Sequence, residues 1–148
     1  MADTDLMQLY SRRILALTTS IPHQGRLEAP DGSAMRRSPQ CGSSVTVDVE
    51  LKDGRITRLG QEVRACALGQ ASAAVLGGNV IGCGRDDIAA ARDQLAAMLK
   101  QGAAPPAAPF AELEALLPAR DYPNRHASIL LAWDATLAAM DQALTEAG

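Results

Sequence analysis

The sequence predicts an α+β fold in which a small antiparallel sheet of about three strands packs against several helices. Apolar and polar residues alternate strictly from Val45 to Leu51, and an Asp53-Gly54 turn follows directly. Apolar residues with helical spacing flank this region on both sides. Strands grouped together and flanked by helices are typical of α+β proteins rather than of repeated βαβ units.

The composition is that of one small domain, which we expect to span residues 1–148. The net charge of −3 gives no electrostatic reason to expect binding to nucleic acid. No segment approaches the roughly 20 apolar residues that span a bilayer, and the N-terminus lacks the pattern of a secretory signal. We therefore expect a cytoplasmic protein without membrane association.

The helices are predicted from apolar residues that recur every three or four positions. They are expected at residues 3–18 with Asp3 or Thr4 as the cap, from residue 67 to Gly77-Gly78, from Asp86 or Asp87 to Gly102, at 110–117 and at 124–146.

Three strands are expected, and they place two cysteines near each other. Residues 26–37 are predicted to form the first strand, and Ile56 to Val63 the return strand, with a bulge near Gly60. Cys41 lies just before the alternating strand and Cys66 just after the return strand, each 12 residues from the Asp53-Gly54 turn. In an antiparallel hairpin the start of one strand neighbours the end of the next, so both thiols are expected at one end of the sheet.

Thiols at that position favour metal or sulfur chemistry. Three cysteines in a reducing compartment do not predict disulfides. Cys66 precedes a predicted helix, whose positive end attracts the thiolate form that binds zinc, iron or a transferred sulfur atom. The competing interpretation is that each cysteine is a small buried hydrophobe, and two thiolates alone do not complete a tetrahedral site. Cys83, between two helices, is expected to be a loop or core cysteine.

Three segments resemble one protein family. Residues 39–43, PQCGS, resemble the segment N-P-x-C-G-D of U-type iron–sulfur cluster assembly scaffolds, the group of the NifU N-terminal domain, IscU and SufU. Residues 64–73 resemble the family's G-C-x-x-x-x-A-S-A segment, and residues 118–133 its last ligand region, R-x-x-C-A-x-L-x-W. The chain is similar to this family as a divergent member, which implies a SufE/NifU-like α+β fold.

The resemblance also implies a site and a role. Ser43 stands where the family carries aspartate and Ser128 where it carries its third cysteine, while His126 could supply a ring nitrogen instead. The resemblance implies that Cys41, Cys66 and a group near the last helix accept sulfur and hold a transient iron–sulfur cluster or a zinc ion. A cysteine desulfurase would supply the sulfur and acceptor proteins would take the cluster. We expect a scaffold and not an enzyme.

Two alternatives remain open at this point. The chain could be a zinc-binding sulfur acceptor or regulator that has lost cluster assembly. It could also be a metal-free module that binds the desulfurase, an interpretation that Ser43 and Ser128 favour. The sequence leaves open whether the chain forms a homo-oligomer.

Overall fold

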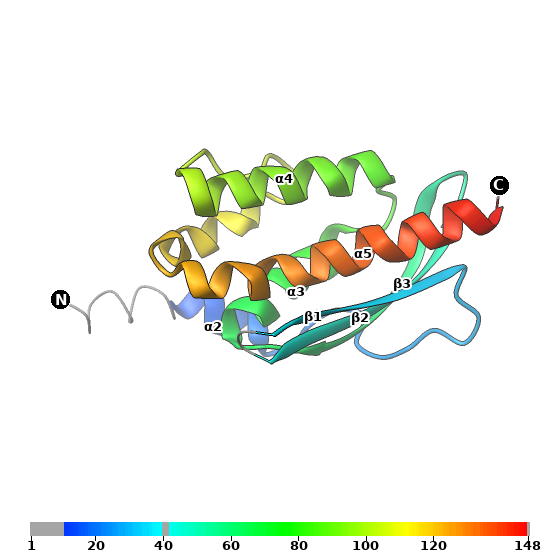
Figure 1. Ribbon diagram of the computed structural model, residues 1–148, viewed down its shortest axis with the longest axis horizontal. Coiled ribbons are helices and arrows are strands. Elements are labelled where there is room, and N and C mark those ends of the chain that lie inside the picture. Colours follow the sequence, from blue (N-terminus) through cyan, green and yellow to red (C-terminus); the bar gives the residue numbers. More distant parts are fainter. Residues whose placement is uncertain (1–10, 40–41, 148) are drawn as a thin grey trace.

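The computed structural model describes residues 11–39 and 42–147 and confirms the α+β class (Figure 1). In chain order its elements are α2 (Arg12–Thr18), β1 (Gly32–Ser38), β2 (Ser43–Lys52), β3 (Arg55–Arg64), α3 (Ala67–Asn79), α4 (Arg85–Gln101), the 3₁₀ segments η1 (Ala111–Asp121) and η2 (Pro123–Arg125), and α5 (His126–Ala147).

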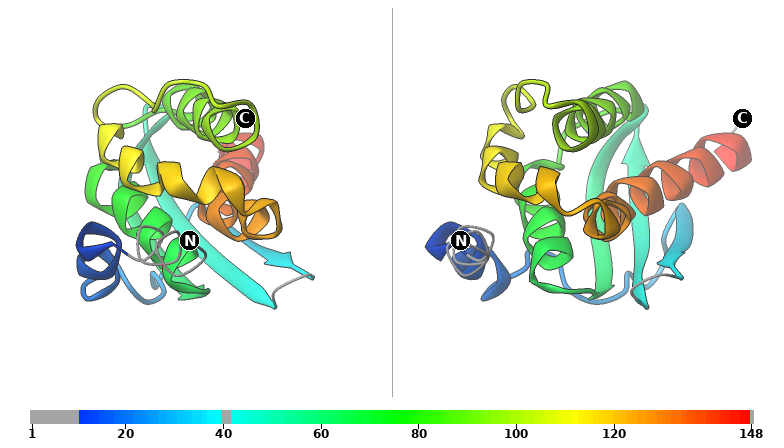
Figure 2. Two further views of the ribbon diagram at one scale, coloured as in Figure 1. Left: turned by 90° about the vertical axis from the view of Figure 1, so that its left-hand side faces the viewer. Right: turned by 60° about the vertical axis from the view of Figure 1, so that its left-hand side comes forward.

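The three strands form one antiparallel sheet in the order β1-β2-β3. Helices α3 and α5 pack together, and α5 runs across β1 and β2 (Figures 1 and 2). Helix α4 packs on α5 and η1 and forms an outer layer. Val45, Val47 and Val49 are buried, which confirms the predicted alternation. At the predicted turn Asp53 has φ 55° and Gly54 φ 79°, the pair of positive values that a type I′ hairpin requires.

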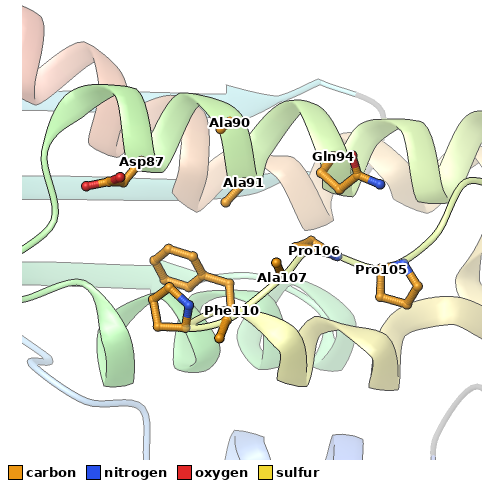
Figure 3. A pocket seen from close by; sticks show the side chains of 10 residues that line it. Asp87, Ala90, Ala91, Gln94, Pro105, Pro106, Ala107 and Phe110 are labelled. Carbon is orange, nitrogen blue, oxygen red and sulfur yellow. The ribbon is translucent and has the colours of Figure 1, made fainter.

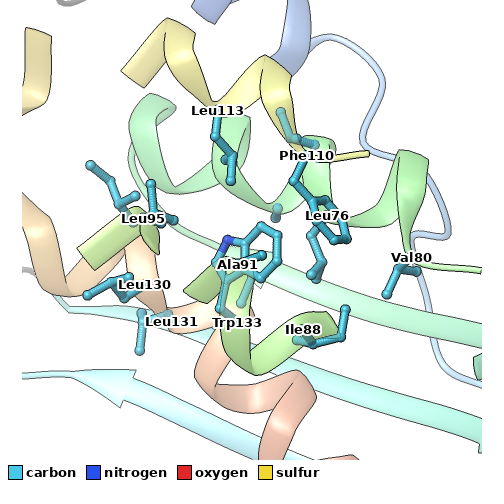
Figure 4. Close-up of a cluster of buried hydrophobic side chains, with 14 of the residues drawn as sticks. Leu76, Val80, Ile88, Ala91, Leu95, Phe110, Leu113, Leu130, Leu131 and Trp133 are labelled. Atoms are coloured by element: carbon cyan, nitrogen blue, oxygen red, sulfur yellow. The ribbon is translucent and has the colours of Figure 1, made fainter. Parts of the chain in front are cut away.

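The core lies between α3, α4, α5 and η1, with Trp133 among the leucines and isoleucines of these elements (Figure 4). Trp133 is fully buried and meets the ring of Phe110 edge to face, with ring centroids 4.9 Å apart. Such pairs contribute about 0.5–1.5 kcal/mol beyond their buried area. This aromatic contact anchors the first half of α5 in the core.

Two predicted elements near the N-terminus were wrong in extent. The helix expected over 3–18 is not helical at Ser11, and its described part begins at Arg12. Ser11 is the N-cap of α2, and its side chain accepts a hydrogen bond from the amide of Ile14. The proposed caps Asp3 and Thr4 lie outside the described residues. The first strand begins at Gly32 and not at residue 26, because residues 26–31 leave the sheet plane to cover Asp48.

Other boundaries also differ from the prediction. Gly60 pairs in register with Asp48, and the irregularity lies instead between Glu50 and Leu51. Helix α3 continues through Gly77 and Gly78 to Asn79. Gly84 caps α4, and Asp87 accepts a hydrogen bond from its amide.

The segment predicted as a helix at 110–117 is a 3₁₀ helix that extends from Ala111 to Asp121. Proline has no amide hydrogen and disfavours α geometry in the residue before it, which explains why the chain around Pro118 does not continue as an α-helix.

In the described part of the chain, no helix combines the length and apolar character needed to cross a membrane.

A buried carboxylate holds residues 26–33 against the outer face of the sheet. Asp48 accepts two hydrogen bonds from the guanidinium of Arg26, one from the amide of Leu27 and one from the hydroxyl of Ser33. Burial alone would raise the pKa of Asp48, but these hydrogen bonds and the charge of Arg26 outweigh it and lower the pKa. The charged form of Asp48 is therefore the stable one in the folded protein.

Replacing Asp48→Asn is expected to lower the free energy of unfolding at pH 7 by about 1–3 kcal/mol, since hydrogen bonds to a charged group are lost. A lowered pKa gives stability that is present above the ordinary carboxyl pKa of about 3.9 and lost as the pH falls through the folded value. The difference between wild type and variant should therefore shrink in acid. Urea denaturation at pH 7, 5 and 3, followed by Trp133 fluorescence, measures it.

The control is Asp93→Asn, which removes an exposed carboxylate from α4 and should change stability by less than about 0.5 kcal/mol. Equal pH dependence of wild type and the Asp48 variant would contradict this account of the covering segment.

Candidate functional site

Cys66 lies where β3 ends and α3 begins. It is the N-cap residue of α3, with φ −66° and ψ 172°, and its side chain makes no capping hydrogen bond. The thiol is half-buried, and its Sγ lies 3.6 Å from Oγ of Ser128. The prediction that Cys66 directly precedes a helix is confirmed.

Two serines lie beside this thiol, at positions to which the resemblance assigns ligands. Ser43 is the first residue of β2 and Ser128 lies in the first turn of α5; both are buried, and their Oγ atoms are 3.1 Å apart. Two thiolate ligands of one tetrahedral zinc, each about 2.3 Å from the metal, lie about 3.8 Å apart. The Cys66–Ser128 separation is therefore close to that of two ligand atoms that share one ion.

Cys41 lies outside the described residues, so its predicted contact with Cys66 stays a prediction. The strands around it are described. Ser38 pairs with Ser43 across β1 and β2, and Ser44 pairs with Arg64 across β2 and β3. The β1–β2 turn and the β3–α3 junction thus lie at the same end of the sheet, as the hairpin pattern predicts.

Helix α5 is held against α3 by a buried polar bridge. Ser72 of α3 donates to the carbonyl of Ile129 at 2.7 Å and accepts from the indole Nε1 of Trp133 at 2.9 Å. Sequence reasoning used Ser72 only as part of a family segment and missed this role. Because Ile129 follows Ser128 in the chain, the bridge fixes Ser128 next to Cys66.

Gly69 permits the close approach of the two helices. A Cβ at this position would lie 2.7 Å from Ser128 Oγ and 2.7 Å from Ala65 Cβ, closer than atoms of these kinds approach. Sequence reasoning did not identify Gly69, since a helical glycine with an ordinary backbone shows its reason only when the partner helix is placed.

His126 is placed differently from the serines. Its ring is 5% exposed, and Nε2 lies 2.9 Å from the carbonyl oxygen of Ala119 in η1. This nitrogen is therefore engaged with the backbone of the preceding segment. The three residues that the structure brings together are Cys66, Ser43 and Ser128.

Cys83 is a core cysteine, as expected. It is buried between α3 and α4, and its thiol donates to the carbonyl of Asn79. Burial, followed by the charge of Asp87, raises the pKa of the Cys83 thiol. Cys83 is thus suited to serve as an internal control for Cys66.

The donor set at the site is one thiol and two hydroxyls among the described residues. Within residues 11–39 and 42–147, no group of three or more histidine, cysteine or acidic side chains is placed to hold a metal ion. A neutral serine hydroxyl is a weaker ligand than a thiolate, so these residues do not fit a tightly held structural zinc.

Two of the hollows on the described surface adjoin α4. One of about 390 Å³ lies between α4 and residues 105–110, lined by alanines and prolines with Asp87, Gln94 and Phe110 (Figure 3). None of its lining residues belongs to the Cys66 site. The other, of about 340 Å³, is lined by β1, α4 and α5 and includes Ser38 and Ala127, which adjoin the site in the chain.

Comparisons with solved structures give strong matches. The N-terminal part of a nitrogen-fixing NifU-like protein from Brucella abortus is 41% identical, with 96% of this chain and 99% of that chain covered and a TM-score of 0.93. A candidate scaffold for iron–sulfur cluster assembly in the SUF system of Fervidobacterium islandicum AW-1 is 21% identical, with 90% and 98% covered and a TM-score of 0.81.

A hypothetical protein of known structure is 23% identical, with 91% of this chain and 98% of that chain covered and a TM-score of 0.77. These last two likenesses concern the fold alone. No protein-family model matches the chain, and a search of curated proteins finds no match.

Replacing Gly69→Ala should lower the free energy of unfolding by about 1–3 kcal/mol, because the added methyl group forces α3 away from α5. The matched control is Gly78→Ala in the same helix, where a Cβ meets only Pro22 Cγ at 3.9 Å. That change should leave stability unchanged or raise it by up to about 1 kcal/mol. Urea midpoints compare the two; equal stability of both variants would contradict the packing described here.

Proposed function

Because this chain belongs to the NifU-like family of U-type iron–sulfur scaffolds, we propose that it accepts sulfur and carries a transient iron–sulfur cluster as a scaffold-like protein. The observation that supports this most is the convergence of Cys66, Ser43 and Ser128 at one end of the sheet. These are three of the positions at which the family resemblance implies ligands. Cys41, the fourth, lies between Ser38 and Ser43 in the sequence.

Sulfur transfer to Cys66 is a balanced exchange. The Cys66 thiolate attacks the outer sulfur of a persulfide on a donor protein, a new S–S bond forms on Cys66, and the donor's S–S bond breaks to leave its thiolate. The net oxidation state of the pair does not change. The hydroxyl of Ser128, 3.6 Å from Sγ, is placed to donate a hydrogen bond to the thiolate or to the bound sulfur.

Cluster binding then requires ligands beyond this trio. Iron–sulfur clusters are held mainly by cysteine thiolates, and Cys66 is the only thiol that the described residues supply to the site. We propose that Cys41 is the second thiolate, with Ser43, Ser128 or His126 as weaker candidate ligands. The remaining ligand would come from a partner protein or a second copy of the chain. Weak ligation suits cargo that must leave.

The partners follow from this role. A cysteine desulfurase would supply the persulfide sulfur, and cluster acceptor proteins would receive the product. We propose a cytoplasmic location for this exchange, in which the chain holds cargo and does not turn over a substrate as an enzyme.

The hydrogen-bonded serine pair favours a second candidate function. Ser43 and Ser128 hydrogen-bond to each other, and a thiol beside a hydroxyl pair can accept sulfur without a metal ion. In this version the protein carries sulfur, with or without a zinc ion, and does not build clusters. The remaining alternative is a metal-free module that only binds the desulfurase.

The test is anaerobic incubation with a cysteine desulfurase, L-cysteine and iron, with mass spectrometry for added sulfur and visible absorption for clusters. We expect the mass of one added sulfur atom on Cys66 and absorption that decays on transfer to an apo-ferredoxin. Cys66→Ser should abolish both, while the matched control Cys83→Ser should retain both.

The outcomes separate the candidates. Added sulfur without visible absorption selects the sulfur acceptor, and zinc found in the purified protein selects its zinc-bound form. Neither added sulfur nor absorption, in a folded protein, contradicts both functions and leaves the desulfurase-binding module.

A further inference from the structure

We propose that a basic groove next to the Cys66 site binds an acidic, extended segment of the protein that donates sulfur. The groove has a volume of about 340 Å³, within the range of ligand sites. Three basic residues and an apolar floor define it: Arg36, Arg92, Lys100, Leu130 and Leu131.

The charge of this groove is opposite to that of the whole chain. Apart from Arg37, which follows Arg36 on β1 and shares the opposite face of the sheet with Ser44 and Thr46, the lining holds three basic residues and one carboxylate, Asp134. The net charge of the chain is −3. Arg92 is paired with Asp134 and Asp93. Arg36 and Lys100 are exposed and form no ion pair with any described residue. Their charges are available to carboxylates of a partner.

The groove adjoins the site through two elements. Ser38 of its lining pairs with Ser43 across β1 and β2, and Ala127 precedes Ser128 at the start of α5. A partner seated in the groove is therefore held at the end of the sheet where Cys66 lies. This step rests on the proposed function, because it assigns the groove to the donor of sulfur.

The shape of the groove favours an extended peptide over a small anion. The amide of Ser33 donates to Gln142 of α5 and not to β2, so it faces the outer edge of β1. With the two-residue period of a strand, the amides of Met35 and Arg37 face the same way. An extended segment can pair with such an edge while its carboxylates meet the arginines and its apolar side chains meet Leu130 and Leu131.

The first experiment measures binding of a fluorescently labelled peptide of alternating glutamate and leucine by anisotropy. The groove variant is Arg36→Glu/Lys100→Glu. The matched control, Arg12→Glu/Arg120→Glu, makes the same change of net charge at two exposed arginines outside the groove. We expect the groove variant to bind at least about tenfold more weakly and the control within about threefold of wild type.

Two outcomes would overturn the proposal. Equal losses in both double variants would mean that binding reflects net charge alone. Competition by citrate at the concentration at which unlabelled peptide competes would mean that the groove holds a small polyanion and not a peptide.

A second measurement separates this proposal from the proposed function. Persulfide formation on Cys66 is followed with two donors, a cysteine desulfurase and inorganic polysulfide. The groove variant should react more slowly only with the desulfurase, and equal slowing with polysulfide overturns the docking role. Failure of wild-type Cys66 to accept sulfur from either donor, with peptide binding intact, rejects the sulfur function and leaves the groove as an acidic-segment site.

Discussion

The geometry of the site depends on the close contact between α3 and α5. The hydroxyl of Ser72 joins the indole of Trp133 to the carbonyl of Ile129, and Gly69 lets the backbones approach. Without this acceptor the buried indole N–H would have no partner, which would lower the free energy of unfolding by about 1–3 kcal/mol. The hydrogen bond therefore favours one arrangement of the two helices. That arrangement fixes where the first turn of α5 lies, and with it the distance from Ser128 to Cys66.

The serine pair changes what this geometry can do. A carboxylate and a thiolate at positions 43 and 128 would repel each other without a metal and attract one strongly. Two hydroxyls instead bond to each other at 3.1 Å and carry no charge. The same backbone therefore presents an uncharged pair of hydroxyls beside Cys66, the single thiol that the described residues supply to the site. A neutral site of this kind suits brief contact with sulfur or a cluster.

Local patterns predicted the sheet and the start of α3, because alternation and an Asp-Gly turn are decided by neighbours in the chain. The placement of Cys66 followed from the same hairpin. The start of α2 after Ser11 and the 3₁₀ geometry of η1 were not predicted, since a cap and one proline outweigh the apolar periodicity there. Gly60 was taken for a bulge, although it is required by the approach of Gly25, whose oxygen would lie 2.6 Å from a Cβ.

Contacts between residues that are far apart in the chain could not be predicted from local sequence patterns alone. Ser128 was placed at the site only by resemblance to a family, because no local rule joins the start of α5 to the end of β3. The basic groove combines Arg36 of β1 with Arg92 and Lys100 of α4, which are far from it in the chain. Its charge becomes visible only when α5 brings these elements together.

The central claim is that positions 43, 66 and 128 face one point in space. It is tested most directly by zinc affinity of the double variant Ser43→Asp/Ser128→Cys, measured by competition with a chromophoric chelator. Convergence predicts at least about tenfold tighter zinc binding than wild type, and loss of that gain when Cys66→Ser is added. A folded double variant with wild-type zinc affinity, or a gain that survives the loss of Cys66, would contradict the account.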